Sequence, residues 1–239
     1  MKLDNPLVVQ WEYASEERLA KRNATYRELL EGVNPEEAVA TAVGESRPER
    51  FLDVGCGLGE LAERVQRELG AEVVAVDISP RMVELTRNRG VEAREADVQA
   101  LPFEDGSFDC VAANWVLYHV PDVERGVREL ARVLAPGGRL VAATLGDGNM
   151  QELWDLLGGE ATAGLSFACD NGRAALEPHF AHVERRQADG TVVFPDEASM
   201  REFVAATTSR SHLASFVPEL AEPFQTRSKH CVFVAEKAA

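Results

Sequence analysis

A glycine-rich decapeptide, FLDVGCGLGE at positions 51–60, constrains the fold more than any other part of this chain. Its apolar start predicts a buried strand, and the glycines at every second position from Gly55 to Gly59 predict a tight turn before a helix. Glycine adopts positive φ without strain and lets a ligand lie directly on the backbone, while the first amide groups of the helix face that ligand. The segment therefore predicts a strand, a ligand-binding turn and a helix, in that order.

The spacing of these glycines argues against a dinucleotide ligand. A dinucleotide fingerprint, G-x-G-x-x-G, needs its third glycine at position 60, where this chain has Glu60, and the third glycine stands one residue earlier at Gly59. Asp53 and Glu60 flank the turn, and both carboxylates repel a pyrophosphate. We expect a ligand with a cationic amino-acid end instead.

Strands and helices alternate after this turn, which predicts an α/β fold with a mostly parallel sheet. The expected strands cover 51–54, 72–77, 91–96, 108–113 and 139–145. The segment 182–194 predicts a hairpin that turns at Asp189-Gly190, and residues 230–236 predict a last strand. Helical patterns cover 14–32, the segment that follows Asn34-Pro35, and the intervals between the parallel strands.

Acidic residues stand at the ends of three successive expected strands, namely Asp53, Asp77 and Asp97. Ligands of open α/β sheets bind at these carboxyl ends. A single acid at such a place is commonly a helix cap, but three in phase with three strands favour a binding site. Asp77 can accept both ribose hydroxyls of a nucleoside, because a carboxylate offers two oxygens for charge-assisted hydrogen bonds. The residues expected around an adenine are Asp97, Val98, Ile78 and Met82.

These motifs resemble those of the class I S-adenosylmethionine-dependent methyltransferases. D-x-G-x-G-x-G after an apolar strand is similar to their first motif. Residues 50–145 resemble the consecutive motifs of the small-molecule branch that includes ubiquinone and menaquinone methyltransferases. The segments that carry the resemblance are FLDVGCGLGE, VVAVDISPRM, EADVQALPFEDGSFDCV, NWVLYHVPD and ELARVLAPGGRLV. The resemblance implies a Rossmann-like, doubly wound sheet of seven mostly parallel strands with an antiparallel last strand, plus a helical cap.

The resemblance also implies S-adenosylmethionine as the cofactor and S-adenosylhomocysteine as the product. It assigns the methionyl part to the glycine turn, with Asn114 beside it, and the nucleoside to the ends of the second and third strands. Cys56 is included as a small residue that fits the turn. The expected cofactor-binding residues are Asp53, Gly55, Cys56, Gly57, Gly59, Asp77, Ile78, Met82, Asp97, Val98 and Asn114.

Methyl transfer needs little covalent machinery, because the sulfonium already activates the methyl group. A hydroxyl acceptor benefits from a general base, and Tyr118 and His119, just beyond the fourth strand, are the candidate catalytic residues. The alternative is that His119 only satisfies backbone near the next helix. Arg18 or Arg22 is a candidate partner of the methionine carboxylate. The candidates for the wall of an apolar acceptor pocket are Trp11, Tyr13, Tyr26, Trp154 and Phe167.

Composition limits the other classes of function. The formal charge of −15 argues against a nucleic-acid partner. The segment 114–117, NWVL, also lacks the two prolines of the turn that amino-methylating nucleic-acid enzymes carry at this place. Four widely spaced cysteines without metal-ligand spacing favour reduced thiols and no metal site. No segment is long and apolar enough for a signal peptide or a membrane span, so we expect a cytoplasmic protein.

We predict a helical cap or lid at 1–45, a methyltransferase core at 46–146 and 178–239, and a cap insertion at 147–177. Residues 1–45 can either pack on the sheet edge or close over the cofactor. The predicted function is transfer of a methyl group from S-adenosylmethionine to a small-molecule acceptor by direct displacement. The alternatives are a non-catalytic cofactor-binding regulator or assembly protein, and an NAD-dependent oxidoreductase.

Overall fold

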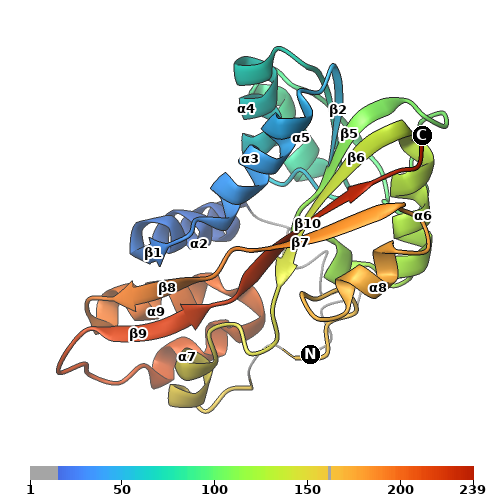
Figure 1. The fold of residues 1–239 in the computed structure, drawn as a ribbon. Helices are drawn as coiled ribbons and strands as arrows, with labels where there is room; N and C mark the ends of the chain where they lie inside the picture. Colours follow the sequence, from blue (N-terminus) through green and yellow to red (C-terminus); the bar gives the residue numbers. More distant parts are fainter. Residues whose placement is uncertain (1–15, 161–162) are drawn as a thin grey trace.

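The structure, a computed structural model, describes residues 16–160 and 163–239. Its central element is a seven-stranded sheet with the order β4-β3-β2-β5-β6-β10-β7 (Figure 1). The strands are β2 (Arg50–Val54), β3 (Glu72–Asp77), β4 (Glu92–Glu95), β5 (Phe108–Ala113), β6 (Leu134–Leu145), β7 (His182–Gln187) and β10 (His230–Glu236). The first five pair in parallel, and β10 pairs antiparallel with both β6 and β7. The predicted Rossmann-like sheet with its antiparallel last strand is confirmed.

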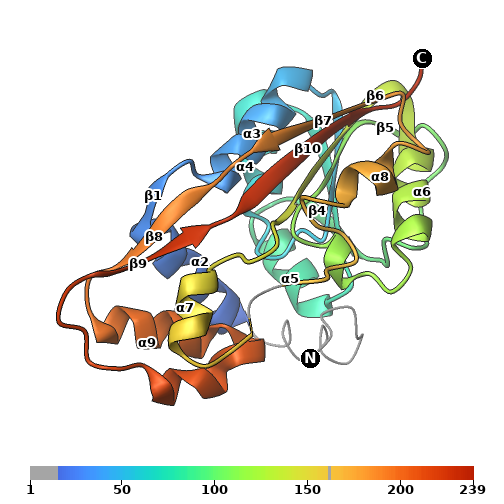
Figure 2. The same cartoon turned by 60° about the horizontal axis from the view of Figure 1, so that its bottom comes forward.

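Helices cover both faces of this sheet (Figure 2). One face packs against α3 (Pro35–Ser46), α4 (Glu60–Leu69) and α5 (Pro80–Asn88), and the other against α6 (Val123–Val133) and α8 (Gly172–Leu176). Strands buried on both faces read as continuous apolar runs, and β3, with the sequence EVVAVD, has four consecutive buried residues. The helices begin at polar caps: the Asn34 side chain accepts from the Glu36 amide at 2.8 Å at the start of α3.

A second sheet of three strands, in the order β1-β8-β9, forms the base of a cap. Its strands are β1 (Leu30–Gly32), β8 (Gly190–Phe194) and β9 (Phe224–Ser228). The helices around it are α2 (Glu16–Leu29), α7 (Gln151–Leu156), α9 (Glu197–Ala206) and the 3-10 helix η2 (Thr208–Phe216). The cap therefore contains residues 190–228, whereas the sequence predicts that they belong to the core. Conversely, residues 165–176 of the expected insertion pack in the core, where Phe167 and Leu176 are fully buried.

One two-stranded ribbon joins the cap to the core. β10 pairs with β7, β9 pairs with β8, and the register is unbroken between them, since Gln187 faces Cys231 and Gly190 faces Ser228. The hairpin predicted at Asp189-Gly190 is therefore wrong: the chain bends there but continues along the same partner. The dipeptide pattern was misleading because it is equally compatible with a bend inside a long strand.

The cysteines differ in part from their prediction. Cys169 and Cys231 form a disulfide, with their Cα atoms 5.8 Å apart, whereas Cys56 and Cys110 are free and buried. The expectation of reduced thiols is therefore wrong for the first pair. Sixty-two residues separate these cysteines in sequence, and only the packing of the loop before α8 against β10 brings them together. Within 16–160 and 163–239, no helix is both long and apolar enough to cross a membrane.

Candidate cofactor and acceptor site

A cleft of about 1370 Å³ lies between the carboxyl ends of the core strands and the inner surface of the cap. The cap closes it with one face of α2, where the lining residues recur at helical spacing: Leu19, Arg22, Asn23, Tyr26 and Arg27. None of the described residues of α2 is fully buried: this face lines the cleft, and Tyr26 on it also packs against the cap core. This placement favours the lid alternative over simple packing on the sheet edge.

The glycine turn forms the roof of the cleft, opposite α2. Gly55, Gly57 and Gly59 all have left-handed φ values of 70°, 52° and 74°. A Cβ on Gly55 would come within 2.8 Å of the Val116 side chain. Gly55 and Gly57 line the cleft, as predicted. Gly59 instead faces away from it, because a Cβ there would meet the Thr86 hydroxyl of α5 at 2.6 Å. Its role is to let the turn pack closely on α5.

Asp77 ends β3 directly beside this turn. Its Oδ2 accepts the Gly57 amide at 3.0 Å, and its Oδ1 accepts the Ser79 amide at 2.9 Å. Each oxygen keeps a further lone pair that can accept a ribose hydroxyl. Burial raises the pKa of Asp77, and burial together with the Asp77 charge raises the pKa of Asp53 to about 7. This pair of buried carboxylates favours a cationic ligand, which would stabilise their ionised forms.

Three of the four residues expected around an adenine line the cleft, and Met82 does not. The Ile78 side chain is large, apolar and 55% exposed, and it lines the cleft together with Asp97 and Val98. The Gln99 side chain donates to both Asp97 oxygens at 3.1 and 3.0 Å. Met82 is fully buried on the inner face of α5 and is not part of the cleft wall. Met82 was expected to contact the adenine because it follows Ile78 closely in sequence, but α5 turns its side chain into the core.

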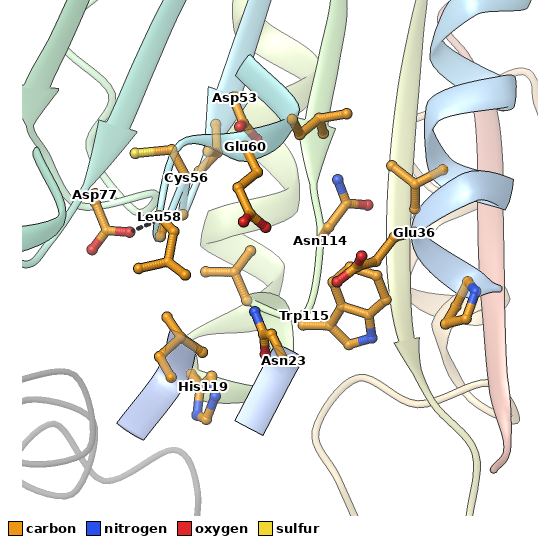
Figure 3. A pocket seen from close by; sticks show the side chains of 18 of the residues that line it. Asn23, Glu36, Asp53, Cys56, Leu58, Glu60, Asp77, Asn114, Trp115 and His119 are labelled. Carbon is orange, nitrogen blue, oxygen red and sulfur yellow. Dashed lines mark hydrogen bonds between the residues drawn. The ribbon is translucent and has the colours of Figure 1, made fainter. Parts of the chain in front are cut away.

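Asn114 follows β5 and lines the cleft; Figure 3 shows it above Trp115, with Asp77 on the other side of the view. Its Oδ1 accepts the Ala143 amide at 3.0 Å, but its buried Nδ2 has no hydrogen-bond partner within the described chain. Such a donor costs about 1–3 kcal/mol unless a ligand accepts from it. The orphaned donor, the bare glycine backbone, the Asp77 carboxylate and the exposed Ile78 together fit S-adenosylmethionine.

The two candidate catalytic residues also reach the cleft. Tyr118 and His119 lie in a single 3-10 turn, η1 (Leu117–His119), with their ring centroids 4.4 Å apart. Figure 3 shows His119 on the lower wall, opposite the glycine turn. Arg22 lines the cleft as well, whereas Arg18 is not among its lining residues.

Of the candidates for the acceptor wall that the structure describes, only Tyr26 lines the cleft. Trp154 is buried in the cap core under the Arg210 guanidinium, 4.2 Å from its ring centroid. Phe167 packs against Phe233 in the core, at 5.6 Å between ring centroids. Both aromatic residues fill a core, the commoner role for this residue type. The other two candidates, Trp11 and Tyr13, lie outside the described residues.

Trp115 and His230 are among the lining residues that were not predicted from the sequence. Trp115 has a left-handed φ of 55°, and its Nε1 donates to Nδ1 of His230 at 3.1 Å. His230 begins β10 and is 7% exposed. Its signal was a lone histidine at the start of an otherwise apolar strand, which has no meaning until the strand's neighbours are known.

Comparison with known proteins identifies the part of the chain that carries the glycine turn. A methyltransferase-domain family model matches residues 52–142. The demethylmenaquinone methyltransferase of Thermus thermophilus is 47% identical over 104 residues, which make up 41% of this chain and 47% of that protein. The ubiquinone biosynthesis O-methyltransferase of Xanthomonas oryzae pv. oryzae is 44% identical over 103 residues, 40% of this chain and 43% of that one. Residues 52–142 are a methyltransferase domain.

Solved structures agree on the fold of this methyltransferase domain. The YcgJ protein of Bacillus subtilis is 17% identical with a TM-score of 0.62, over 85% of this chain and 99% of that one. The [4+2]-cyclase SpnF is 20% identical with a TM-score of 0.60, over 85% and 80%. The prediction of a methyltransferase with S-adenosylmethionine as its cofactor is confirmed for residues 52–142. The chain spans less than half the length of the sequence relatives it matches, and SpnF bears the name of a different reaction.

Proposed function

We propose that this protein transfers the methyl group of S-adenosylmethionine to a small-molecule acceptor and releases S-adenosylhomocysteine. The observation that carries the proposal is the contact of Asp77 with the glycine turn. It places a buried carboxylate with free lone pairs beside a bare backbone surface, within a methyltransferase domain. The names of the two quinone-pathway relatives support a small molecule as the acceptor.

The cofactor would lie along the tips of β4, β3 and β2. Asp77 would accept the ribose hydroxyls, Ile78 and Val98 would contact the adenine, and Gly55 and Gly57 would face the methionyl chain. Asn114 Nδ2 would donate to an oxygen of the methionyl end. When bound, the cofactor supplies an electrophilic methyl group that needs no further activation.

The chain's own residues would then align the acceptor and exclude water. The face of α2 that lines the cleft covers the reaction site, and tight closure strengthens the electrostatic contacts inside it. In the reaction a bond forms between the acceptor atom and the methyl carbon while the carbon–sulfur bond breaks, and sulfur leaves as a neutral thioether. For a hydroxyl acceptor we propose that His119 or a water molecule takes the proton.

The test is formation of S-adenosylhomocysteine by the purified protein with a panel of phenols, hydroquinones, amines and carboxylic acids. We expect product with at least one neutral aromatic acceptor and none with boiled protein. His119→Ala should keep cofactor binding, and a loss of turnover would assign the base role to His119. Cofactor binding without product from any acceptor would favour a non-catalytic regulator.

Measuring the melting temperature with each cofactor distinguishes an oxidoreductase from a methyltransferase. A ligand that binds only the folded state raises its melting temperature. We expect S-adenosylhomocysteine to raise it and NAD or NADH to leave it unchanged. A shift with NAD alone would contradict the proposal.

A further inference from the structure

The ribbon that joins core and cap bends at His230, in the wall of the cleft. The His230 amide donates to Asp189 Oδ1 at 3.0 Å across the ribbon. On one side of this joint β10 belongs to the core sheet, and on the other Ser228 ends β9 of the cap sheet. The His230 side chain is therefore placed to contact both parts of the molecule.

A chain of hydrogen bonds runs through this imidazole. The Trp115 indole donates to Nδ1, and an indole nitrogen can only donate, so Nδ1 must be unprotonated. The ring hydrogen then lies on Nε2, which is 3.3 Å from Tyr26 Oη. Tyr26 Oη is in turn 2.5 Å from Ser228 Oγ. With Nε2 as donor and Ser228 as acceptor, Tyr26 Oη keeps one lone pair for a hydrogen bond from a ligand.

The backbone of Trp115 is strained, and its indole is held in place by a hydrogen bond. A left-handed conformation costs a bulky residue about 1–2 kcal/mol and persists only where the surroundings enforce it. Here the Trp115 amide donates to the Ala143 carbonyl at 2.8 Å, and the ring is held by His230. The two rings meet edge to face, 6.0 Å apart and at 73°. The wall is thus built to hold one orientation of the indole.

The electrostatic surroundings of this wall are neutral to acidic. Burial lowers the pKa of His230 to about 4, so the ring is uncharged at neutral pH. Burial raises the pKa of the Tyr26 hydroxyl to about 12, and the negative charges of Glu36 and Asp189 raise it as well. Arg27 is bound to Glu36, and Arg22 is the other α2 cation at the cleft. At the wall itself an anionic acceptor would meet uncharged rings and the Arg27–Glu36 ion pair, with the Asp189 carboxylate behind them.

We propose that His230 is a positioning residue of the acceptor subsite, and that with Trp115 and Tyr26 it makes this subsite selective for an uncharged aromatic compound with a hydroxyl group. The inference rests on the proposed methyl transfer. His230 is not the base, because Nδ1 is engaged by the indole and Nε2 already carries hydrogen. It holds the indole as one wall and the Tyr26 phenol as a second. The acceptor ring packs on Trp115 while its hydroxyl donates to Tyr26 Oη.

The charge selectivity is tested with a matched pair of probes. Catechol and 3,4-dihydroxybenzoate share a ring and two hydroxyls and differ by one carboxylate. Each is titrated calorimetrically into the protein saturated with S-adenosylhomocysteine. We expect catechol to bind at least about tenfold more tightly, a difference of about 1.4 kcal/mol. Equal affinities, tighter binding of the acid through Arg22, or no binding of either probe would overturn the inference.

The role of His230 is tested by substitution in the same assay. His230→Leu removes both ring nitrogens and should weaken catechol binding about tenfold, with the S-adenosylhomocysteine Kd unchanged within about twofold. His230→Asn, whose amide oxygen can accept from the Trp115 indole in place of Nδ1, should recover most of the loss. His182→Leu, an exposed position on the same ribbon, is the matched control.

Unchanged catechol binding in His230→Leu, or equal losses for both ligands, would contradict the positioning role. If His230→Leu does not fold, Trp115→Phe serves instead: it removes the indole donor together with part of the aromatic wall and should also weaken catechol alone. A wild-type protein that fails to bind S-adenosylhomocysteine would refute the proposed function itself, which is a separate result.

Discussion

At the scale of single residues, the proposed cofactor site depends most on Asp77. Asp77→Ala should weaken S-adenosylhomocysteine binding about tenfold to a hundredfold, because losing a charge-assisted hydrogen bond to ribose costs about 1.5–3 kcal/mol. Isothermal titration calorimetry measures this directly. Asp170→Ala, in an exposed loop, is the control and should bind normally. Normal binding by Asp77→Ala would remove Asp77 from the ribose site.

Asp53 makes a second residue-scale prediction, about pH. Its pKa of about 7 means that the carboxylate becomes charged between pH 6 and 8, beside the cationic end of the proposed ligand. Affinity for S-adenosylmethionine should therefore increase with pH over this interval, by up to about tenfold for each unit of pKa shift. Asp53→Asn should flatten the pH dependence. A flat profile in the wild type would show that no cationic group binds near Asp53.

At the scale of elements, two glycine-to-alanine substitutions, one in the glycine turn and one at the end of α4, distinguish backbone strain from steric collision. Gly55→Ala and Gly70→Ala both place a side chain at left-handed φ, which costs about 1–2 kcal/mol. The new Cβ at Gly70 meets nothing within 4 Å, whereas at Gly55 it would collide with Val116 at 2.8 Å. We expect Gly55→Ala to lose about 1–3 kcal/mol more in the free energy of unfolding, and to lose cofactor binding as well. Equal losses in urea titrations would show that the Val116 contact relaxes freely.

The elements also show what a sequence can and cannot reveal. The strand order and the acids at the strand ends were predictable because each βα unit is local and its motif lies within about thirty residues. The cap was not, since its sheet joins β1 to strands some 160 and 195 residues away along the chain. Asp189-Gly190 illustrates the limit: its local pattern predicts a turn, and only the partner strand makes it a bend. His230 gained its meaning in the same way, from Trp115 and Tyr26.

At the scale of the whole molecule, two buried groups give stability opposite dependences on pH. The folded state raises the pKa of Asp53 from about 3.9 to about 7, so its contribution is lost as pH rises through that window. It lowers the pKa of His230 from about 6.5 to about 4, so that contribution is lost as pH falls. The two effects oppose each other between about pH 4 and 6.5.

Removing either group should remove its share of the pH dependence, while other groups such as Asp77 keep theirs. Relative to the wild type, Asp53→Asn should gain stability as pH rises from 4.5 to 6.5, and His230→Asn should lose stability over the same interval. Urea denaturation at both pH values measures the two slopes against that of the wild type. Variant slopes on the same side of the wild-type slope would contradict the burial of one of the groups.

In the proposed complex, the tips of β2, β3 and β4 hold the cofactor and leave the Trp115 wall to the acceptor. A crystal structure with S-adenosylhomocysteine tests it most directly. We predict the ribose hydroxyls on the Asp77 carboxylate, the adenine against Ile78 and Val98, and the sulfur turned toward Trp115. A ligand bound elsewhere in the cleft, or with its ribose away from Asp77, would contradict the account.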